Sequence, residues 1–69
     1  MEEARELSGR ERAVLRGIAE DKTYAQIAYG LGLSYETVKS YANRLRAKLG
    51  VNSKTGLALY WERNCKEAG

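Results

Sequence analysis

Residues 23–50 read TYAQIAYGLGLSYETVKSYANRLRAKLG, and this stretch decides the fold. Thr23, with a glutamine three residues later, is a capping-box pattern that begins a short helix over residues 24–31. Gly32 suits the left-handed backbone conformation that ends a helix, and Ser34 can cap the helix that follows. Two helices joined by a short turn that contains glycine are typical of a helix-turn-helix motif.

The second helix of this motif, predicted over residues 35–48, has one apolar face and one polar, basic face. Four apolar side chains fall within about 40° of one line when each residue turns the helix by about 100°. These side chains are Val38, Ala42, Leu45 and Leu49. The opposite face suits entry into a DNA major groove, because its short polar groups can approach bases while its long cations reach phosphates. It holds Glu36, Ser40, Asn43 and Ala47 at its centre, with Lys39 and Arg44 at its edges.

Two further helices are predicted outside this motif. Ser8 and Glu11 form a second capping-box pattern, which begins a helix over residues 9–20. Ser53 can cap a last helix over residues 54–64. The predicted fold is therefore all-α, with four helices of which the third would be the recognition helix.

Length and charge narrow the possible functions. The chain has 69 residues, enough for one domain, which we expect over residues 7–69 after a flexible segment at residues 1–6. The net charge of +3 and the isoelectric point of about 9.2 favour a polyanionic partner. Residues 39–54 contain Lys and Arg but no acidic residue. This asymmetry favours nucleic acid over an ordinary solvated helix face, which is the alternative.

Other classes of protein lack support in the sequence. There is no histidine, no metal-spaced cysteine cluster and no glycine-rich phosphate loop, so we expect no enzyme, metal, cofactor or small-molecule ligand. No apolar run approaches the roughly 20 residues of a membrane span, and the charged first residues do not resemble a secretory signal. The single cysteine, Cys65, suits a reducing compartment, so we expect a cytoplasmic protein.

The predicted fourth helix is apolar on more than one side. One face consists of Leu57, Ala58, Trp61 and Cys65. Leu59 and Tyr60 point away from that face, and a domain of this size has no second core to bury them. We therefore predict a homodimer interface that includes Leu59, Tyr60 and Arg63. The alternative is that Tyr60 packs over the first helix while Leu59 is simply exposed.

Short motifs along most of the chain resemble the LuxR/GerE-type DNA-binding domain. In order, they are LSGRERAVL at residues 7–15, IA at 27–28, LGLS at 31–34, TVK at 37–39 and KLGV at 48–51. The chain looks like a stand-alone member of bacterial or phage origin, similar to the GerE spore regulator. A fragment of a larger regulator is the alternative.

The resemblance implies a transcription regulator whose third helix enters the major groove of double-stranded DNA. It also implies that the fourth helix makes the dimer contact. By motif position, base contacts fall on Lys39, Ser40 and Asn43, and phosphate contacts fall on Ser34, Thr37, Arg44 and Lys48. We expect such a protein in the cytoplasm, associated with the nucleoid, with RNA polymerase as a further candidate partner.

The chain departs from the family pattern at several positions. Residues 24–26, YAQ, stand where members commonly carry a cation that contacts the DNA backbone. Tyr41 replaces a common histidine, Lys54 replaces an arginine at the start of the fourth helix, and Gly56 replaces a glutamate. The third helix and its caps would therefore carry more of the phosphate contacts.

The rival function is protein interaction. A small module that docks on RNA polymerase or on a regulator would also fit, including a domain like region four of a sigma factor. Four tyrosines give this idea weight, because tyrosine is common at protein interfaces. They are Tyr24, Tyr29, Tyr35 and Tyr41. Binding to duplex DNA that weakens steeply with salt would discriminate the two functions.

Overall fold

The computed structural model describes residues 7–65, and this part of the chain is helical without any strand. Its elements are α2 (Gly9–Ala19), α3 (Tyr24–Leu31), α4 (Tyr35–Leu49), α5 (Lys54–Tyr60) and the π-helical turn η1 (Trp61–Cys65). The predicted all-α fold is confirmed. The fourth helix, predicted as one element, is α-helical only to Tyr60 and then widens into η1. Residues 1–6, predicted to be flexible, lie outside the described part.

Side-chain caps begin the helices where the sequence predicts them. The Ser8 hydroxyl accepts from the Glu11 backbone N–H at 3.1 Å, and the Glu11 carboxylate accepts from the Ser8 N–H at 2.9 Å. Thr23 begins α3 through the same reciprocal pair of bonds with its glutamine. Gly32 and Gly50 end α3 and α4 with φ of 70° and 71°, a conformation that costs glycine little.

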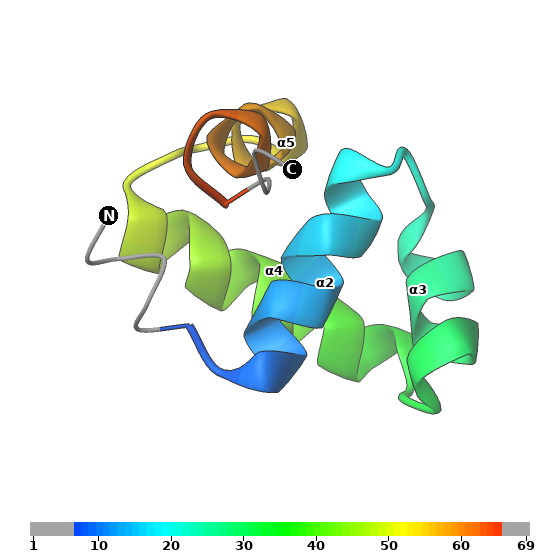
Figure 1. Ribbon diagram of the computed structural model, residues 1–69. Helices are drawn as coiled ribbons and strands as arrows, with labels where there is room; N and C mark the ends of the chain where they lie inside the picture. Colours follow the sequence, from blue (N-terminus) through cyan, green and yellow to red (C-terminus); the bar gives the residue numbers. More distant parts are fainter. Residues whose placement is uncertain (1–6, 66–69) are drawn as a thin grey trace.

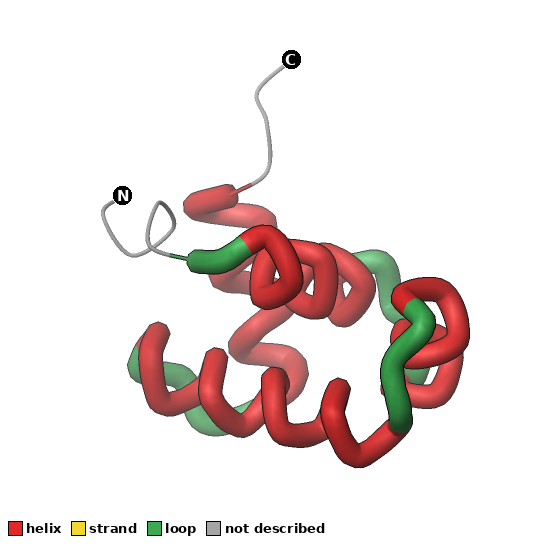
Figure 2. The backbone as a smooth tube through the Cα atoms, turned by 90° about the horizontal axis from the view of Figure 1, so that it is seen from below, coloured by secondary structure: helices red, strands yellow, loops and turns green. Residues whose placement is uncertain are grey.

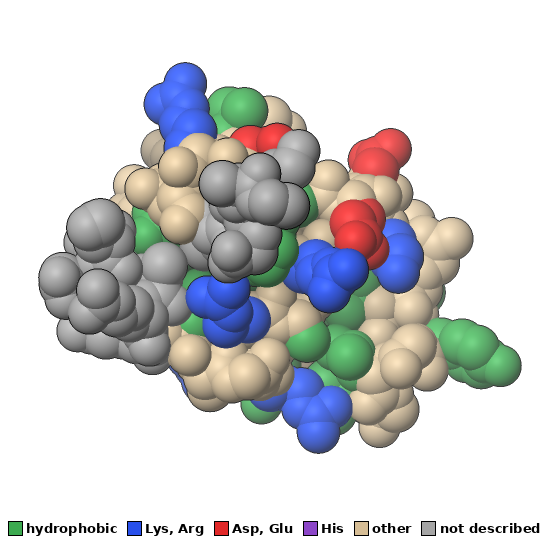
Figure 3. Space-filling view, in the orientation of Figure 1, with side chains coloured by type: hydrophobic (Ala, Val, Ile, Leu, Met, Phe, Trp, Pro, Cys, Tyr) green, Lys and Arg blue, Asp and Glu red, His purple; other side chains and the backbone are tan. Residues whose placement is uncertain are grey.

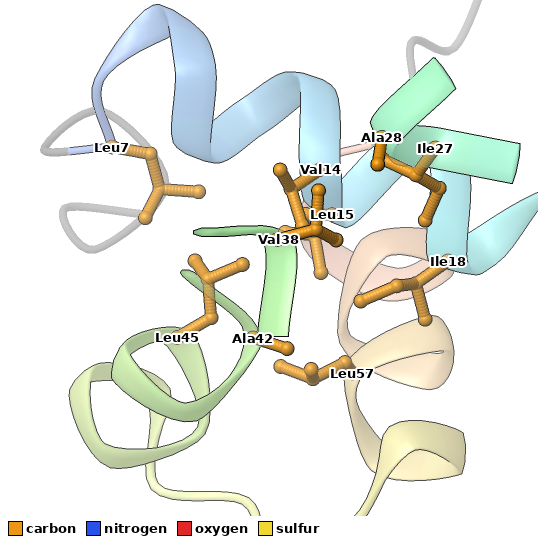
Figure 4. Packing of buried hydrophobic residues seen from close by; sticks show 10 residues of the cluster. All are labelled: Leu7, Val14, Leu15, Ile18, Ile27, Ala28, Val38, Ala42, Leu45 and Leu57. Atoms are coloured by element: carbon orange, nitrogen blue, oxygen red, sulfur yellow. The ribbon is translucent and has the colours of Figure 1, made fainter. Parts of the chain in front are cut away.

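The helices surround one small core. Figure 1 shows α2 in the middle of the molecule, with α3 at one side, α5 above it and α4 across the lower half. The view from below in Figure 2 shows the helices joined by short loops. Every helix contributes to the core, whose side chains point toward one another in Figure 4. The buried apolar residues are Leu7, Val14, Leu15, Ile18, Ile27, Ala28, Val38, Ala42, Leu45 and Leu57.

Gly17 allows α2 and α3 to approach closely. A Cβ atom at this position would lie 2.8 Å from Cγ1 of Ile27, closer than van der Waals contact permits. Any larger residue here would force the Ile27 side chain to move.

Of the two positions that the sequence left open for Tyr60, the structure shows the packed one. Tyr60 is half-buried and packs against the core, as does Trp61, whose ring lies 5.6 Å from the Arg12 guanidinium. The core can receive both aromatic side chains because α2 packs against α5 and η1. Leu59 remains exposed, with 52% of its surface accessible. The side chain of Cys65, predicted to lie on the apolar face of the fourth helix, is outside the part that the structure describes.

Candidate nucleic-acid interface

The three predicted base-contacting residues lie together on the open face of α4. Lys39, Ser40 and Asn43 are all exposed, whereas Val38 and Ala42 on the other side of the helix are completely buried. Because the core packs against one side of α4, the helix cannot rotate about its axis, and its outer face points in a fixed direction.

Asn43 is oriented by a neighbour on the same helix. The Arg46 guanidinium donates a hydrogen bond to Oδ1 of Asn43. Arginine offers only donors, so the amide oxygen of Asn43 must face Arg46 and not the reverse. This contact determines which side of the amide carries the donor NH2 group, and it was not predicted from the sequence.

One side of the open face, here called the α2 edge, consists of Ser34, Thr37, Tyr41, Arg44 and Lys48. Ser34 caps α4 by accepting from the Thr37 N–H at 3.1 Å, and its hydroxyl lies 2.9 Å from the Thr37 hydroxyl. The Arg44 guanidinium lies 5.4 Å from the centre of the Tyr41 ring, within the range of a cation–π contact. The α2 edge therefore brings together all the predicted phosphate-contacting residues.

Lys48 also has a partner inside the fold. Its ammonium lies 3.2 Å from Oε1 of Glu11, which is 37 residues away in the sequence and only 4% exposed. The bond from the Ser8 N–H and then the Lys48 charge hold the pKa of the Glu11 carboxyl below its ordinary value of 4.5. The predicted phosphate contact of Lys48 thus competes with a structural ion pair that joins α4 to the start of α2.

The opposite side, here called the α5 edge, is built from three helices. It consists of Tyr35 and Lys39 of α4, Tyr24 of α3 and Lys54 of α5. The Tyr24 and Tyr35 rings have centroids 6.2 Å apart at 55°, and the Lys54 ammonium lies 4.8 Å from the centre of the Tyr24 ring. The sequence marked Tyr24 and Lys54 as departures from a family pattern, and Tyr24 also as one of four tyrosines suited to a protein interface. Nothing in their spacing indicates that they meet.

The face seen in Figure 3 has a different charge pattern. Basic and acidic side chains lie beside one another there. Glu20 pairs with Arg16 at 3.1 Å and with Lys22 at 3.4 Å. The open face of α4 carries only one acidic residue, Glu36, in its first turn, where the helix dipole favours it. Acidic side chains therefore neutralise less of the positive charge on the open face of α4 than on the face seen in Figure 3.

The predicted dimer residues differ in exposure. Leu59 and Arg63 are exposed, whereas Tyr60 is half-buried. Over residues 7–65, no cluster of three or more His, Cys, Asp or Glu side chains is arranged to hold a metal ion. No helix in the same part of the chain has the length and apolar character to cross a membrane.

Comparisons with known proteins identify the wider family. The model of the family described as "Bacterial regulatory proteins, luxR family" matches residues 5–61. The chain is 41% identical over 54 residues to the DNA-binding transcriptional activator DevR/DosR of Mycobacterium tuberculosis, covering 78% of the chain and 25% of that relative. It is 42% identical over 55 residues to the uncharacterized transcriptional regulatory protein YhcZ of Bacillus subtilis, covering 80% of the chain and 26% of the relative.

A third relative is the regulatory protein SdiA of Escherichia coli, 40% identical over 53 residues, which cover 77% of the chain and 22% of that protein. The chain thus spans about a quarter of the length of the curated relatives it matches. No solved structure matches the chain significantly.

Proposed function

The chain belongs to the LuxR family of bacterial regulatory proteins, and on that premise we propose that it regulates transcription by binding specific sequences of double-stranded DNA. The open face of α4 carries this proposal. It combines short polar groups at its centre with cations at its edges, on a helix whose other side is buried. A bacterial chromosome as the target would place the protein in the cytoplasm, with the nucleoid.

We assign α4 as the helix that enters the major groove. Lys39, Ser40 and Asn43 would then contact base edges, since lysine and asparagine can bind the hydrogen-bonding groups that distinguish bases there. Arg44, Thr37 and Ser34 on the α2 edge would contact phosphates and hold the helix in register. This division separates residues that select a sequence from residues that supply affinity.

The test is binding to duplex DNA over a range of salt concentrations, after a selection from random oligonucleotides has identified a preferred site. Affinity should fall by about 0.9 log units per log unit of salt for each phosphate contacted. Lys39→Ala and Asn43→Ala should reduce the preference for that site over random DNA, with little effect on folding. The control is Arg16→Ala, because Arg16 is exposed on α2 and already pairs with Glu20. Selectivity unchanged in both α4 variants would rule out α4 as the recognition helix.

We also propose that the protein binds DNA as a dimer through α5 and η1. Leu59 supports this, because it is one of few large apolar side chains left exposed in the described residues, and Arg63 is exposed close by in the sequence. A charged residue at position 59 should shift sedimentation from dimer to monomer. The same change at Tyr29, on α3, is the control. A wild-type protein that stays monomeric both in solution and on DNA would exclude this interface.

A protein-docking function is the second candidate, favoured by Tyr29, which is 92% exposed on α3. Such a module would bind RNA polymerase or another regulator. A domain like region four of a sigma factor is one example. It predicts weak binding to duplex DNA even at low salt. The salt titration therefore separates the two functions.

A further inference from the structure

The predicted phosphate-contacting residues all lie on one side of α4. With a turn of about 100° per residue, Ser34, Thr37, Arg44 and Lys48 fall on the same side of a line drawn along the centre of the open face. A helix in the major groove lies between two phosphate backbones, one at each wall of the groove. The α2 edge would serve one wall, which leaves the other wall to the α5 edge.

The α5 edge has a cation at a suitable place. Lys54 is exposed, and within the described residues no carboxylate pairs with its ammonium, whereas Lys22 and Lys48 each pair with a glutamate. The Tyr24 ring supports this ammonium from one side at 4.8 Å. A cation–π contact of this kind leaves the N–H groups on the other side available to an anion.

The contact between Lys54 and Tyr24 is continued by a contact between Tyr24 and α4. Tyr24 contacts Tyr35, the first residue of α4, and Lys39 follows Tyr35 by four residues, on the same side of the helix. Lys39, Tyr35, Tyr24 and Lys54 thus form a continuous strip beside the open face. The strip carries a cation at each end, and both Tyr24 and Tyr35 remain partly accessible.

We propose that Lys54, held by the Tyr24 ring, binds a DNA phosphate on the groove wall opposite to the one served by Arg44. This inference rests on the proposed DNA-binding function and extends it to residues of α3 and α5. It also accounts for the absence of a cation in the first turn of α3, because α5 supplies a positive charge at that place in space. Tyr24 acts as a positioning residue, and Lys54 makes the contact.

The experiment measures the salt dependence of affinity for the selected duplex in Lys54→Ala, Lys54→Arg, Tyr24→Leu and Tyr24→Phe variants. Lys54→Ala should make the salt slope shallower by about 0.9 per bound subunit. The loss of affinity between about 50 and about 200 mM salt should then shrink by about 3.5-fold per subunit. Lys54→Arg and Tyr24→Phe should keep the wild-type slope, because each retains the charge or the ring. Tyr24→Leu should weaken binding by about two- to fivefold, the usual strength of an exposed cation–π contact.

Selectivity provides the second readout. A phosphate contact predicts that Lys54→Ala weakens binding to preferred and random duplexes by the same factor. Thermal unfolding should be unchanged in Lys54→Ala, since Lys54 is exposed and Ser53 still caps α5. If Tyr24→Leu unfolds, because Tyr24 packs partly on the core, the Lys54 variants alone decide the phosphate contact.

Two failures are distinguishable. If the wild-type protein shows no salt-dependent binding to duplex DNA, the proposed function itself is wrong. If the wild type binds, and Lys39→Ala loses selectivity while Lys54→Ala keeps the wild-type slope, only the role of Lys54 is overturned. A folded Tyr24→Leu variant with unchanged affinity would remove the positioning role of the ring.

Discussion

The α2 edge and the α5 edge flank the same face of α4, but different interactions hold them. On the α2 edge, Lys48 forms an ion pair with Glu11, which is buried and also caps α2. On the α5 edge, the Lys54 ammonium lies over the Tyr24 ring and has no carboxylate partner among residues 7–65. Lys48 therefore joins α4 to α2 through a carboxylate, while the charge of Lys54 stays open to an anionic partner.

Because of this difference, some charged residues should affect the stability of the fold and others the affinity for DNA. Removing Glu11 is costly, because its buried carboxylate accepts hydrogen bonds both from the Ser8 N–H and from Lys48. Exposed charges contribute little to folding but remain free to bind phosphate. We therefore expect changes at Glu11 to lower the free energy of unfolding, and changes at Arg44 or Lys54 to lower the affinity for DNA.

The largest expected effect is that of Glu11→Ala on stability. The substitution removes the acceptor for the Ser8 N–H and leaves the Lys48 ammonium without its carboxylate. Loss of a cap and of a charged hydrogen bond should lower the free energy of unfolding by about 2 kcal/mol, measured by urea denaturation. The control is Glu20→Ala, whose carboxylate pairs only with cations at the surface. Equal effects of the two substitutions would show that the contacts of Glu11 with Ser8 and Lys48 stabilise the fold no more than a surface ion pair does.

The second expected effect is a loss of stability in acid. Because the folded-state pKa of Glu11 is lowered, its carboxylate stabilises the fold above the ordinary pKa of 4.5, and this contribution disappears as pH falls from 4.5 through the folded-state pKa. Urea unfolding at several pH values should show a steeper decline below pH 4.5 for the wild type than for Glu11→Gln. Glu20, whose pKa is lowered by Arg16 and then Lys22, remains ionisable in both proteins. Parallel pH profiles would contradict a role for the Glu11 charge.

The smallest expected effects distinguish two cations of the α2 edge. Arg44→Ala should weaken binding evenly across DNA sequences and lower the salt slope by about one unit per bound subunit. Lys48→Ala should change the slope less and the thermal stability more, because its ammonium is paired with Glu11. If Lys48→Ala lowers the slope as much as Arg44→Ala does, Lys48 leaves Glu11 to contact DNA.

Much of the open face was predictable from local patterns. Lys39, Ser40 and Asn43 share a face because residues three and four apart in a helix lie side by side, and the buried seam of α4 follows the same rule. The supports of that face were not predictable. Arg46 reaches Asn43 within one helix, but its rotamer depends on packing, and the partners of Lys48 and Lys54 come from other helices.

The sequence by itself determined where the first three helices begin, where they end to within one residue, and which side of each is apolar. Caps and left-handed glycines act over three or four residues. The residues next to Ser8, Thr23, Ser34 and Gly50 are therefore enough to predict these helix ends. Only the tertiary structure decided that Glu11 meets Lys48, that Tyr60 packs against the core, and that α5 begins beside Tyr24. These contacts depend on how closely and at what angle the helices cross. That geometry arises from the whole packed core, including the close approach at Gly17, and no local spacing encodes it.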